Sequence, residues 1–225
     1  MDYGEKQIMA YYFDQYMKNL IYDSEYAYSL LDNQYKEKRF ESYENFEKFV
    51  NDNLDCFKRS VLLKYQIESF DKYKEYICHD NFDNYYIFKE IGPMNYTILL
   101  DQYTIEDEIF KTTYNKQRDD NNKAQLRLSL VNQMLNRKDY NALYNVLDKD
   151  FKEKVFNNQE SFEKYVKENF FELNGFEYTN FSKEGNKYKI KTEISDLKNN
   201  TNDKKVKRFL VELSENDEFL ISFDI

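Results

Sequence analysis

The sequence predicts an α+β protein made of two tandem domains. Three observations lead to this prediction: a chain of 225 residues, a helix-forming segment that occurs twice, and a change from helical to strand periodicity after each copy. At roughly 100–200 residues per domain, a chain of this length suits one or two domains. We place the first domain at residues 1–114 and the second at residues 115–225.

The repeated segment covers residues 28–54 and residues 144–170, at a constant offset of 116 and without a gap. Thirteen of the 27 aligned positions are identical, and Phe46 with Phe162 is one of the matched pairs. Aromatic and aliphatic residues match in register, which a shared bias toward Lys and Glu does not produce. Two related domains of about 110 residues follow, close to the commonest domain size.

Each copy has the spacing of amphipathic helices. Tyr28, Leu31 and Tyr35 recur at three and four residues and predict one apolar helical face. A second helix follows, and it begins near Ser42 in the first copy and Asn158 in the second, both favourable N-cap residues. A longer helix precedes each pair, at about residues 7–20 and 124–135.

After the helices the apolar period changes to two, as in half-buried antiparallel strands. In the first domain we expect strands at residues 73–78, 85–89 and 95–103, with turns at residues 80–84 and at Gly92-Pro93. In the second domain we expect strands at residues 176–181, 187–194, 209–213 and 219–225, with a mobile hairpin tip at residues 199–205. Residues 105–122 join the two domains.

Composition excludes several classes of function. The net charge of −9 argues against nonspecific nucleic-acid binding, which depends on clustered Lys and Arg. The four glycines lie too far apart for a phosphate loop, and one His with two Cys matches no zinc pattern. We therefore expect no nucleic-acid partner, no cofactor and no metal. Cys56 and Cys78 are read as two thiols, with a disulfide as the alternative in an oxidising compartment.

The longest apolar runs, such as residues 96–100, are far shorter than the ~18–20 residues of a membrane span. Residues 1–6 lack the basic start and apolar core of a signal peptide. We expect no transmembrane segment in this chain. For its location we prefer an extracytoplasmic fragment of a membrane-anchored protein, with a cytoplasmic protein as the alternative.

Three helices followed by a curved antiparallel sheet, in about 110 residues, resemble the cone-shaped nuclear-transport-factor-2-like (NTF2-like, cystatin-like) superfamily. In tandem, the pattern is similar to the paired extracytoplasmic domains of conjugation and type IV secretion membrane proteins of Gram-positive bacteria. It is also similar to uncharacterised two-domain proteins with the same helix unit. The resemblance implies two cone-like domains. It carries over no catalytic motif, because such folds host isomerases, dehydratases, transport adaptors and scaffolds alike.

Individual residues give weak functional signals. His79 ends a strand and is best explained as exposed turn chemistry. Asp14, beside Tyr11, Tyr12 and Tyr16 of the first helix, could face a cone interior, but a Tyr/Phe-lined core explains this region better. Residues 80–84 contain Asp and Asn as in a calcium loop, but lack its central Gly and terminal Glu. The acidic residues 106–108 and the basic residues 204–208 are read as solvated charge. We assign no catalytic, cofactor-binding or metal-binding residue.

Charge and tyrosine are distributed unevenly. Residues 1–115 contain 13 Lys/Arg and 22 Asp/Glu, a net charge of −9, whereas residues 116–225 contain 20 of each. Tyrosine divides 17 to 5 across the same point. The uneven distribution has two possible explanations. The first domain has either an acidic, tyrosine-rich surface that binds a partner, or an ordinary acidic surface over a tyrosine-rich core.

We therefore predict a non-enzymatic binding or scaffold protein, with an unidentified protein partner or self-association and with the cell envelope as one location. The alternative is a small-ligand carrier, or an isomerase or dehydratase, that uses one cone. Its sign would be a pocket of several hundred Å³ with Asp14 or a tyrosine hydroxyl pointing inward. A third hypothesis, a pseudo-enzyme that dimerises through its sheet, predicts exposed apolar residues on strand 219–225.

Overall fold

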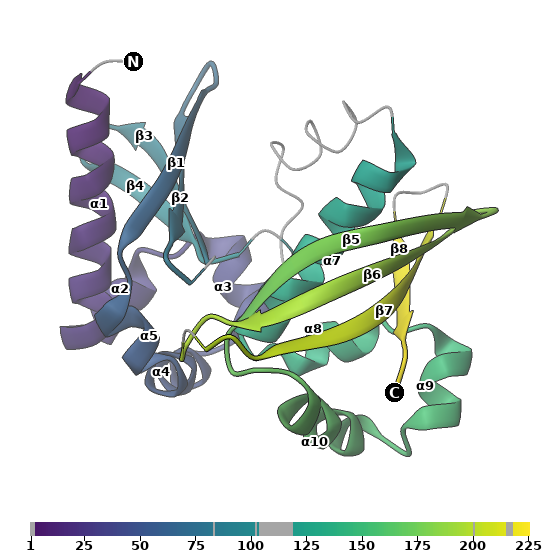
Figure 1. The fold of residues 1–225 in the computed structure, drawn as a ribbon. Coiled ribbons are helices and arrows are strands. Elements are labelled where there is room, and N and C mark those ends of the chain that lie inside the picture. Colours follow the sequence, from purple (N-terminus) through teal and green to yellow (C-terminus); the bar gives the residue numbers. More distant parts are fainter. Residues whose placement is uncertain (1–2, 83, 102, 104–118, 200, 215–217) are drawn as a thin grey trace. The chain divides into compact units, whose positions relative to one another are not determined.

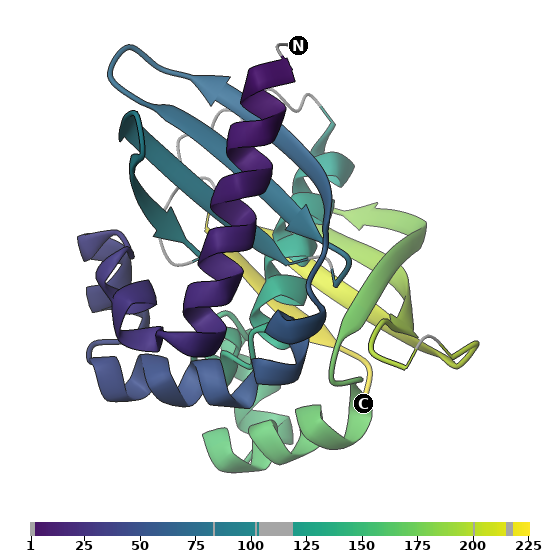
Figure 2. The same cartoon turned by 90° about the vertical axis from the view of Figure 1, so that its left-hand side faces the viewer.

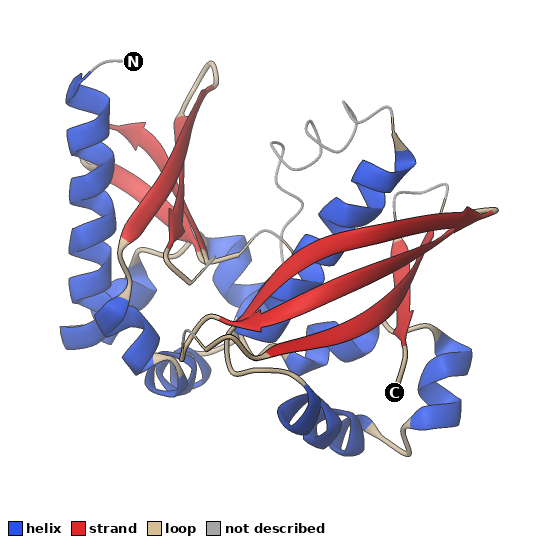
Figure 3. Ribbon diagram, in the orientation of Figure 1, coloured by secondary structure: helices blue, strands red, loops and turns tan. Residues whose placement is uncertain are grey.

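The computed structural model describes residues 3–82, 84–101, 103, 119–199, 201–214 and 218–225 (Figure 1). The chain divides into two compact units, Met1–Asp107 and Glu108–Ile225. Each unit has helices first and a four-stranded antiparallel sheet after them (Figure 3), which confirms the α+β class. The predicted boundary between residues 114 and 115 and the acidic residues 106–108 lie outside the described residues.

In the first unit the sheet has the strand order β1-β2-β3-β4, so each strand pairs with its neighbour in the chain. Tight hairpins therefore join the strands, and the helices all precede them. The elements of this unit are α1 (Tyr3–Tyr22), α2 (Ser24–Ser29), α3 (Asn33–Arg39), α4 (Tyr43–Asp52), α5 (Leu54–Arg59), β1 (Leu62–Ser69), β2 (Lys74–Asp80), β3 (Tyr85–Gly92) and β4 (Asn95–Leu99).

The second unit has the same plan, with the strand order β5-β6-β7-β8. Its first helix begins at Asp120, within the range that the sequence predicted for the junction. The elements of this unit are α7 (Asp120–Asn136), α8 (Tyr140–Asn145), α9 (Lys149–Val155), α10 (Gln159–Asn169), β5 (Asn174–Glu184), β6 (Lys187–Asp196), β7 (Lys204–Leu213) and β8 (Phe219–Phe223).

Helix α1 lies across one face of the first sheet (Figure 2). Its buried side chains recur at helical spacing and include Tyr12, Phe13 and Tyr16, each exposed by 1% or less. The ring of Phe13 meets the edge of Tyr86 at 5.3 Å, and the ring of Tyr16 meets Phe88 at 6.2 Å, both in T-shaped geometry. The core of the first unit is therefore an aromatic layer between α1 and the sheet.

The predicted single helix through Tyr28, Leu31 and Tyr35 is wrong. The structure has two short helices, α2 and α3, separated at Leu31, which forms an isolated parallel bridge with Ile98 on the edge strand β4. The Asp32 amide donates to the carbonyl of Ile98 at 3.0 Å, and the Ile98 amide donates to the carbonyl of residue 30 at 2.9 Å. Backbone groups that a continuous helix would use internally thus bind the sheet instead.

The second unit has the same junction. Leu147 bridges Ile221 on β8, the Asp148 amide donates to the Ile221 carbonyl at 2.8 Å, and the Ile221 amide donates to the Val146 carbonyl at 2.9 Å. Leu147 follows Leu31 at the offset of 116 that the sequence repeat predicts. The aspartate after each bridge caps the next helix, in both units at the same position.

Ring contacts within the helices also repeat. The centroids of Phe40 and Phe46 lie 5.0 Å apart at an interplanar angle of 83°, and those of Phe156 and Phe162 lie 5.1 Å apart at 78°. Phe46 and Phe162 have no exposed surface. The two copies therefore bury corresponding rings in corresponding geometry, as the sequence predicts.

The sequence did not predict two elements of the first unit. Helix α5 and strand β1 fill residues 54–69, and the first sheet has four strands rather than the three expected. Strand β1 is an edge strand without a fully buried residue, so it lacks a clear apolar alternation. In the second unit, β7 begins at Lys204 and extends into the segment that was expected to be a hairpin tip.

Cys56 is half-buried and Cys78 is buried, and within the described chain the two form no disulfide. Burial raises the pKa of the Cys78 thiol to about 12. A thiol with so high a pKa is a poor nucleophile at neutral pH. Cys78 is therefore read as structural.

Removing one matched ring should destabilise either unit. Phe46→Ala and Phe162→Ala each leave a cavity in a closed aromatic core, and we expect a loss of about 3–5 kcal/mol in the free energy of unfolding. Urea denaturation followed by circular dichroism measures this loss. A loss below about 1 kcal/mol for either variant would show that its ring is not part of a packed core.

Removing the cap after the bridge should have a smaller effect that is equal in the two units. Asp32→Ala and Asp148→Ala each remove a carboxylate that accepts a backbone N–H of the next helix, at 3.1 Å and 2.8 Å. We expect each to cost about 1 kcal/mol. Asp32→Asn should lose less than Asp32→Ala, and Asp14→Ala, an exposed change inside α1, serves as the control. Equal effects of Asp14→Ala and Asp32→Ala would contradict the capping role.

Candidate functional site

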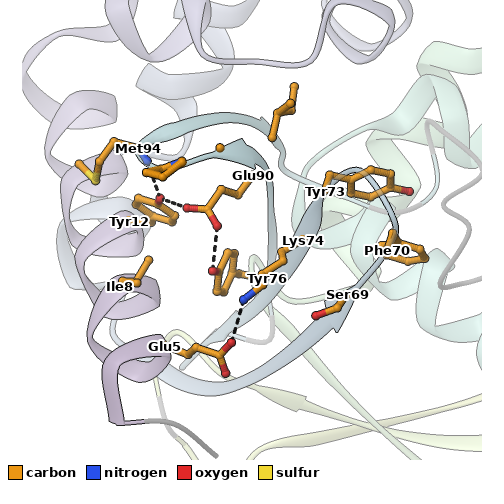
Figure 4. A pocket seen from close by; sticks show the side chains of 13 residues that line it. Glu5, Ile8, Tyr12, Ser69, Phe70, Tyr73, Lys74, Tyr76, Glu90 and Met94 are labelled. Atoms are coloured by element: carbon orange, nitrogen blue, oxygen red, sulfur yellow. Dashed lines mark hydrogen bonds and ion pairs between the residues drawn. The ribbon is translucent and has the colours of Figure 1, made fainter.

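A pocket of about 460 Å³ opens in the first unit, where the N-terminal half of α1 meets the ends of the two hairpins of the sheet (Figure 4). This volume lies in the range of small-molecule sites. Its lining comes from α1 (Glu5, Ile8, Tyr12), from the β1–β2 hairpin (Ser69, Phe70, Tyr73, Lys74, Tyr76) and from the β3–β4 hairpin (Glu90, Ile91, Gly92, Pro93, Met94).

The polar centre of the pocket is the carboxylate of Glu90. The Tyr12 hydroxyl donates to its Oε1, and the Tyr76 hydroxyl donates to its Oε2 at 3.0 Å (Figure 4). The Met94 amide in turn donates to the Tyr12 oxygen at 3.3 Å. Each oxygen of the carboxylate thus has one phenol donor, and the two donors come from different elements.

Strand register explains this arrangement. Tyr76 lies opposite Phe88, and Lys74 lies opposite Glu90, in the β2–β3 ladder. Side chains two residues apart on a strand share a face, so Tyr76 and Glu90 point to the same side of the sheet. Tyr12 reaches the same place from α1, which covers that face.

Both phenols are held in their protonated form. Burial first, and then the hydrogen bond to Glu90, raise the pKa of Tyr76 to about 12. Burial and the same carboxylate raise the pKa of Tyr12 well above its usual range. Removing either phenol proton would place a second negative charge beside Glu90 in a partly buried site. The two phenols are therefore uncharged at neutral pH and act as hydrogen-bond donors to Glu90.

The mouth of the pocket combines an ion pair with exposed apolar groups. The Lys74 ammonium lies 2.9 Å from the Glu5 carboxylate, and both side chains remain partly exposed. Ile8, Ile91 and Met94 are exposed by 40%, 63% and 61%. Such apolar exposure around one opening is a common feature of binding sites.

The second unit has different residues at the matching positions. The repeat offset places Leu128 where Tyr12 stands, and the strand register places Leu213 where Glu90 stands, since each pairs two residues before the bridging isoleucine. The chemistry of the pocket is therefore particular to the first unit.

Tyr188 lies where Tyr76 stands and donates instead to Asp120 at 2.9 Å. Asp120 also pairs with Lys183 at 2.8 Å. The second unit thus places its tyrosine hydroxyl on a carboxylate from the start of its first helix, and the strand that matches β3 supplies no acid there.

The residues singled out in the sequence lie elsewhere. Asp14 is exposed on α1 and does not line the pocket. His79 packs its ring against Tyr85 at a centroid distance of 3.6 Å, on the face of β2 opposite Tyr76. Neither residue takes part in the cluster around Glu90.

The expected turn at residues 80–84 is present between β2 and β3, with residue 83 outside the described part. Asp80 is 3% exposed, and its Oδ1 accepts the amides of Phe82 and Asn84 at 2.9 Å and 2.8 Å. Its Oδ2 accepts the Tyr86 hydroxyl at 3.0 Å. The carboxylate therefore organises the hairpin rather than facing a ligand.

The basic residues 204–208 are engaged within the second unit. The Lys204 ammonium pairs with Glu193 at 3.0 Å, and the Lys207 ammonium donates to the Tyr165 hydroxyl at 2.8 Å. In residues 219–225, Leu220 and Ile225 are 40% and 65% exposed, while Ile221 and Phe223 are buried. Two exposed apolar side chains are thus present in the segment for which sheet-mediated dimerisation predicts them, and the dimerisation itself stays a prediction.

Across the described residues, no three His, Cys, Asp or Glu side chains gather in a way that could hold a metal ion. In the same part of the chain, no helix has the length and hydropathy needed to span a bilayer.

Sequence reasoning missed Tyr76 and Glu90 and placed Tyr12 only in the core. Tyr76 and Glu90 are 14 residues apart on separate strands, so neither forms a motif in the sequence. One signal was present: Glu90 follows the buried residues Tyr86 and Phe88 at a spacing of two, and so lies on the same face of β3.

Comparison of the chain with known protein families, with curated protein sequences and with solved structures found no match.

The raised pKa of Tyr76 predicts a particular response to alkaline pH. An unfolded tyrosine has a pKa near 10, so between pH 10 and 12 the unfolded chain releases a proton that the folded chain keeps. The free energy of unfolding should therefore fall as pH rises through this window. Tyr76→Phe should make that fall shallower by the equivalent of one proton and leave the slope between pH 7 and 9 unchanged.

Urea denaturation at pH 9, 10, 11 and 12 measures these slopes. Tyr22→Phe, which changes a ring that is 84% exposed, is the matched control. Identical slopes for the wild type and Tyr76→Phe would show that the phenol is not held protonated by the pocket.

Proposed function

We propose that the chain is a non-enzymatic binding protein, and that its first unit receives part of a protein partner in the pocket around Glu90. The observation that carries the proposal is the combination of a half-buried carboxylate, aromatic walls and an exposed apolar mouth. Interfaces are rich in tyrosine and commonly seat an anchoring side chain in a pocket. The excess of acidic residues in the first half of the chain supports a partner of opposite charge.

The geometry favours binding over catalysis. An oxyanion hole needs donors aimed at the substrate, whereas both phenol protons of the cluster are directed at Glu90. Here the two tyrosines donate hydrogen bonds to the carboxylate and position it, as expected of a recognition site.

We further propose that each unit is an NTF2-like, cone-shaped domain. The order of elements supports this proposal, since several helices precede a four-stranded antiparallel sheet whose one face the first helix covers. Enzymes of that superfamily work inside the cone, and the pocket between the hairpin ends of the first unit and the start of α1 supports a comparable use of this unit. Two copies in tandem suit a scaffold protein whose first unit binds the partner.

A small-ligand carrier is the second candidate, and the pocket volume of about 460 Å³ favours it. The two functions differ in the probe that they accept. A carrier binds small molecules on its own, whereas a partner-binding protein needs the chain around the anchoring side chain for most of its affinity.

Blocking the pocket tests the proposed function. Gly92 lines the pocket, and a Cβ added there meets no atom within 4 Å, so Gly92→Phe introduces a bulky ring at the pocket wall from an unobstructed Cβ position. A random peptide library displayed on phage is selected on the wild type, on Gly92→Phe and on Val206→Phe, the last a control at an exposed site of the second unit.

We expect peptides enriched on the wild type to bind Gly92→Phe at least tenfold more weakly and Val206→Phe unchanged. Binding of small-molecule fragments in the pocket, without any enriched peptide, would support the carrier instead. Enrichment that Gly92→Phe leaves intact would contradict a function of this pocket.

A further inference from the structure

The half-buried Glu90 carboxylate has a tyrosine donor on each of its two oxygens. Each accepts one phenol hydrogen bond, from Tyr12 on Oε1 and from Tyr76 on Oε2. An ionised carboxylate has about four acceptor sites, two on each oxygen. One site on each oxygen is therefore left for a ligand, and because a carboxylate is planar, one ligand can use the free sites of both oxygens together. Two parallel N–H donors match this arrangement.

The charges of the pocket point to a cation. Its lining holds two carboxylates, Glu5 and Glu90, and one ammonium, that of Lys74. The Glu5–Lys74 pair lies at the mouth, where partly exposed ion pairs contribute little stability and exchange partners readily. The Glu90 carboxylate lies between the two phenols (Figure 4). Glu90 is half-buried, so a cation that reaches it is attracted more strongly than by a fully exposed carboxylate.

The walls point to a flat cation on an aliphatic stem. The aromatic rings of Tyr12 and Tyr76 flank Glu90 and approach each other at 5.8 Å, edge to face. Ile8, Ile91 and Met94 surround the opening through which a ligand must pass. A guanidinium is planar, weakly hydrated and able to donate two parallel hydrogen bonds, and an arginine stem is apolar. An ammonium is a compact and strongly hydrated charge, which suits these walls less well.

Resting on the proposed function, we propose that the pocket binds a guanidinium group, that of an arginine side chain in a protein partner, through a bidentate contact with Glu90. The Tyr12 and Tyr76 hydroxyls hold the carboxylate in the orientation that this contact needs. The Glu5–Lys74 pair forms the rim, and Glu5 can pair with a second basic residue of the same partner. A carboxylate paired in this way with arginine gives both strength and geometric selectivity.

The second unit supports this assignment by contrast. The positions that match Tyr12 and Glu90 hold Leu128 and Leu213, so its corresponding region lacks the carboxylate that would receive the guanidinium. The double variant Tyr12→Leu/Glu90→Leu therefore gives the first unit the residues of the second at these two positions. It removes the proposed receptor while keeping side chains that this fold already accommodates.

Isothermal titration with four small probes tests the proposal on the full chain. The probes are agmatine, Nα-acetyl-arginine N-methylamide, the matching lysine compound and the matching citrulline compound, which is an uncharged isostere of arginine. A fifth probe is a hexapeptide with one central arginine, compared with the same peptide carrying citrulline. The protein variants are Glu90→Gln, Gly92→Phe, Tyr12→Leu/Glu90→Leu and Asp120→Asn, the last a control in the second unit.

We expect the arginine peptide to bind at least tenfold more tightly than its citrulline form, and the arginine compound more tightly than the lysine compound. Glu90→Gln, Gly92→Phe and the double variant should each weaken arginine binding at least tenfold, and Asp120→Asn should leave it unchanged. Tighter binding of the peptide than of agmatine identifies a protein partner as the source of the guanidinium. Equal or tighter binding of agmatine would assign the pocket to a free guanidinium compound and overturn the protein source.

Two results would overturn the guanidinium assignment and spare the proposed function. One is equal binding of arginine and citrulline peptides that Gly92→Phe still abolishes, and the other is arginine binding that Glu90→Gln leaves unchanged. Should no probe and no library peptide bind in a way that Gly92→Phe affects, both the assignment and the proposed function fail. If Glu90→Gln does not fold by circular dichroism, the citrulline comparison on the wild type and the Gly92→Phe variant still decide the question.

Discussion

Both units depend on one junction, at which a break between two short helices joins the last strand of the sheet. Leu31 and Leu147 each give up helical geometry and form a parallel bridge with an isoleucine of the edge strand. The bridge satisfies the backbone groups that the break exposes, and it covers an edge that would otherwise be open. It also places the helices so that rings such as Phe46 and Phe162 meet the same neighbours in each unit.

Because the same bridge fixes the helices and the sheet in both units, the two units can carry different side chains in the same architecture. In the first unit a carboxylate sits on the covered face of the sheet, and such a group is costly to bury unless donors satisfy it. Tyr12 and Tyr76 supply those donors, one from the helix and one from the sheet. The second unit carries leucine in the two positions that matter and directs its tyrosine, Tyr188, to an acid on the helix instead.

The uneven distribution of charge and tyrosine along the chain agrees with the composition of the pocket. The first half of the chain carries the whole net charge of −9 and most of the tyrosine, and the pocket brings both kinds of residue together. Much of that tyrosine is also core: Tyr12, Tyr16 and Tyr86 are almost fully buried. A tyrosine-rich core and a tyrosine-rich pocket are therefore compatible. The ring of Tyr12 packs in the core against Phe88, while its hydroxyl donates to Glu90 in the pocket.

The sequence by itself determined the repeat, the α+β class, the helix caps at Ser42 and Asn158 and most of the strands, because periodicity and capping act over a few neighbouring residues. Only the tertiary structure decided three features: the break at Leu31, the edge strand β1 and the cluster around Glu90. Each depends on partners far along the chain. Strand register and the placement of α1 bring those partners together, and no local pattern encodes such distances.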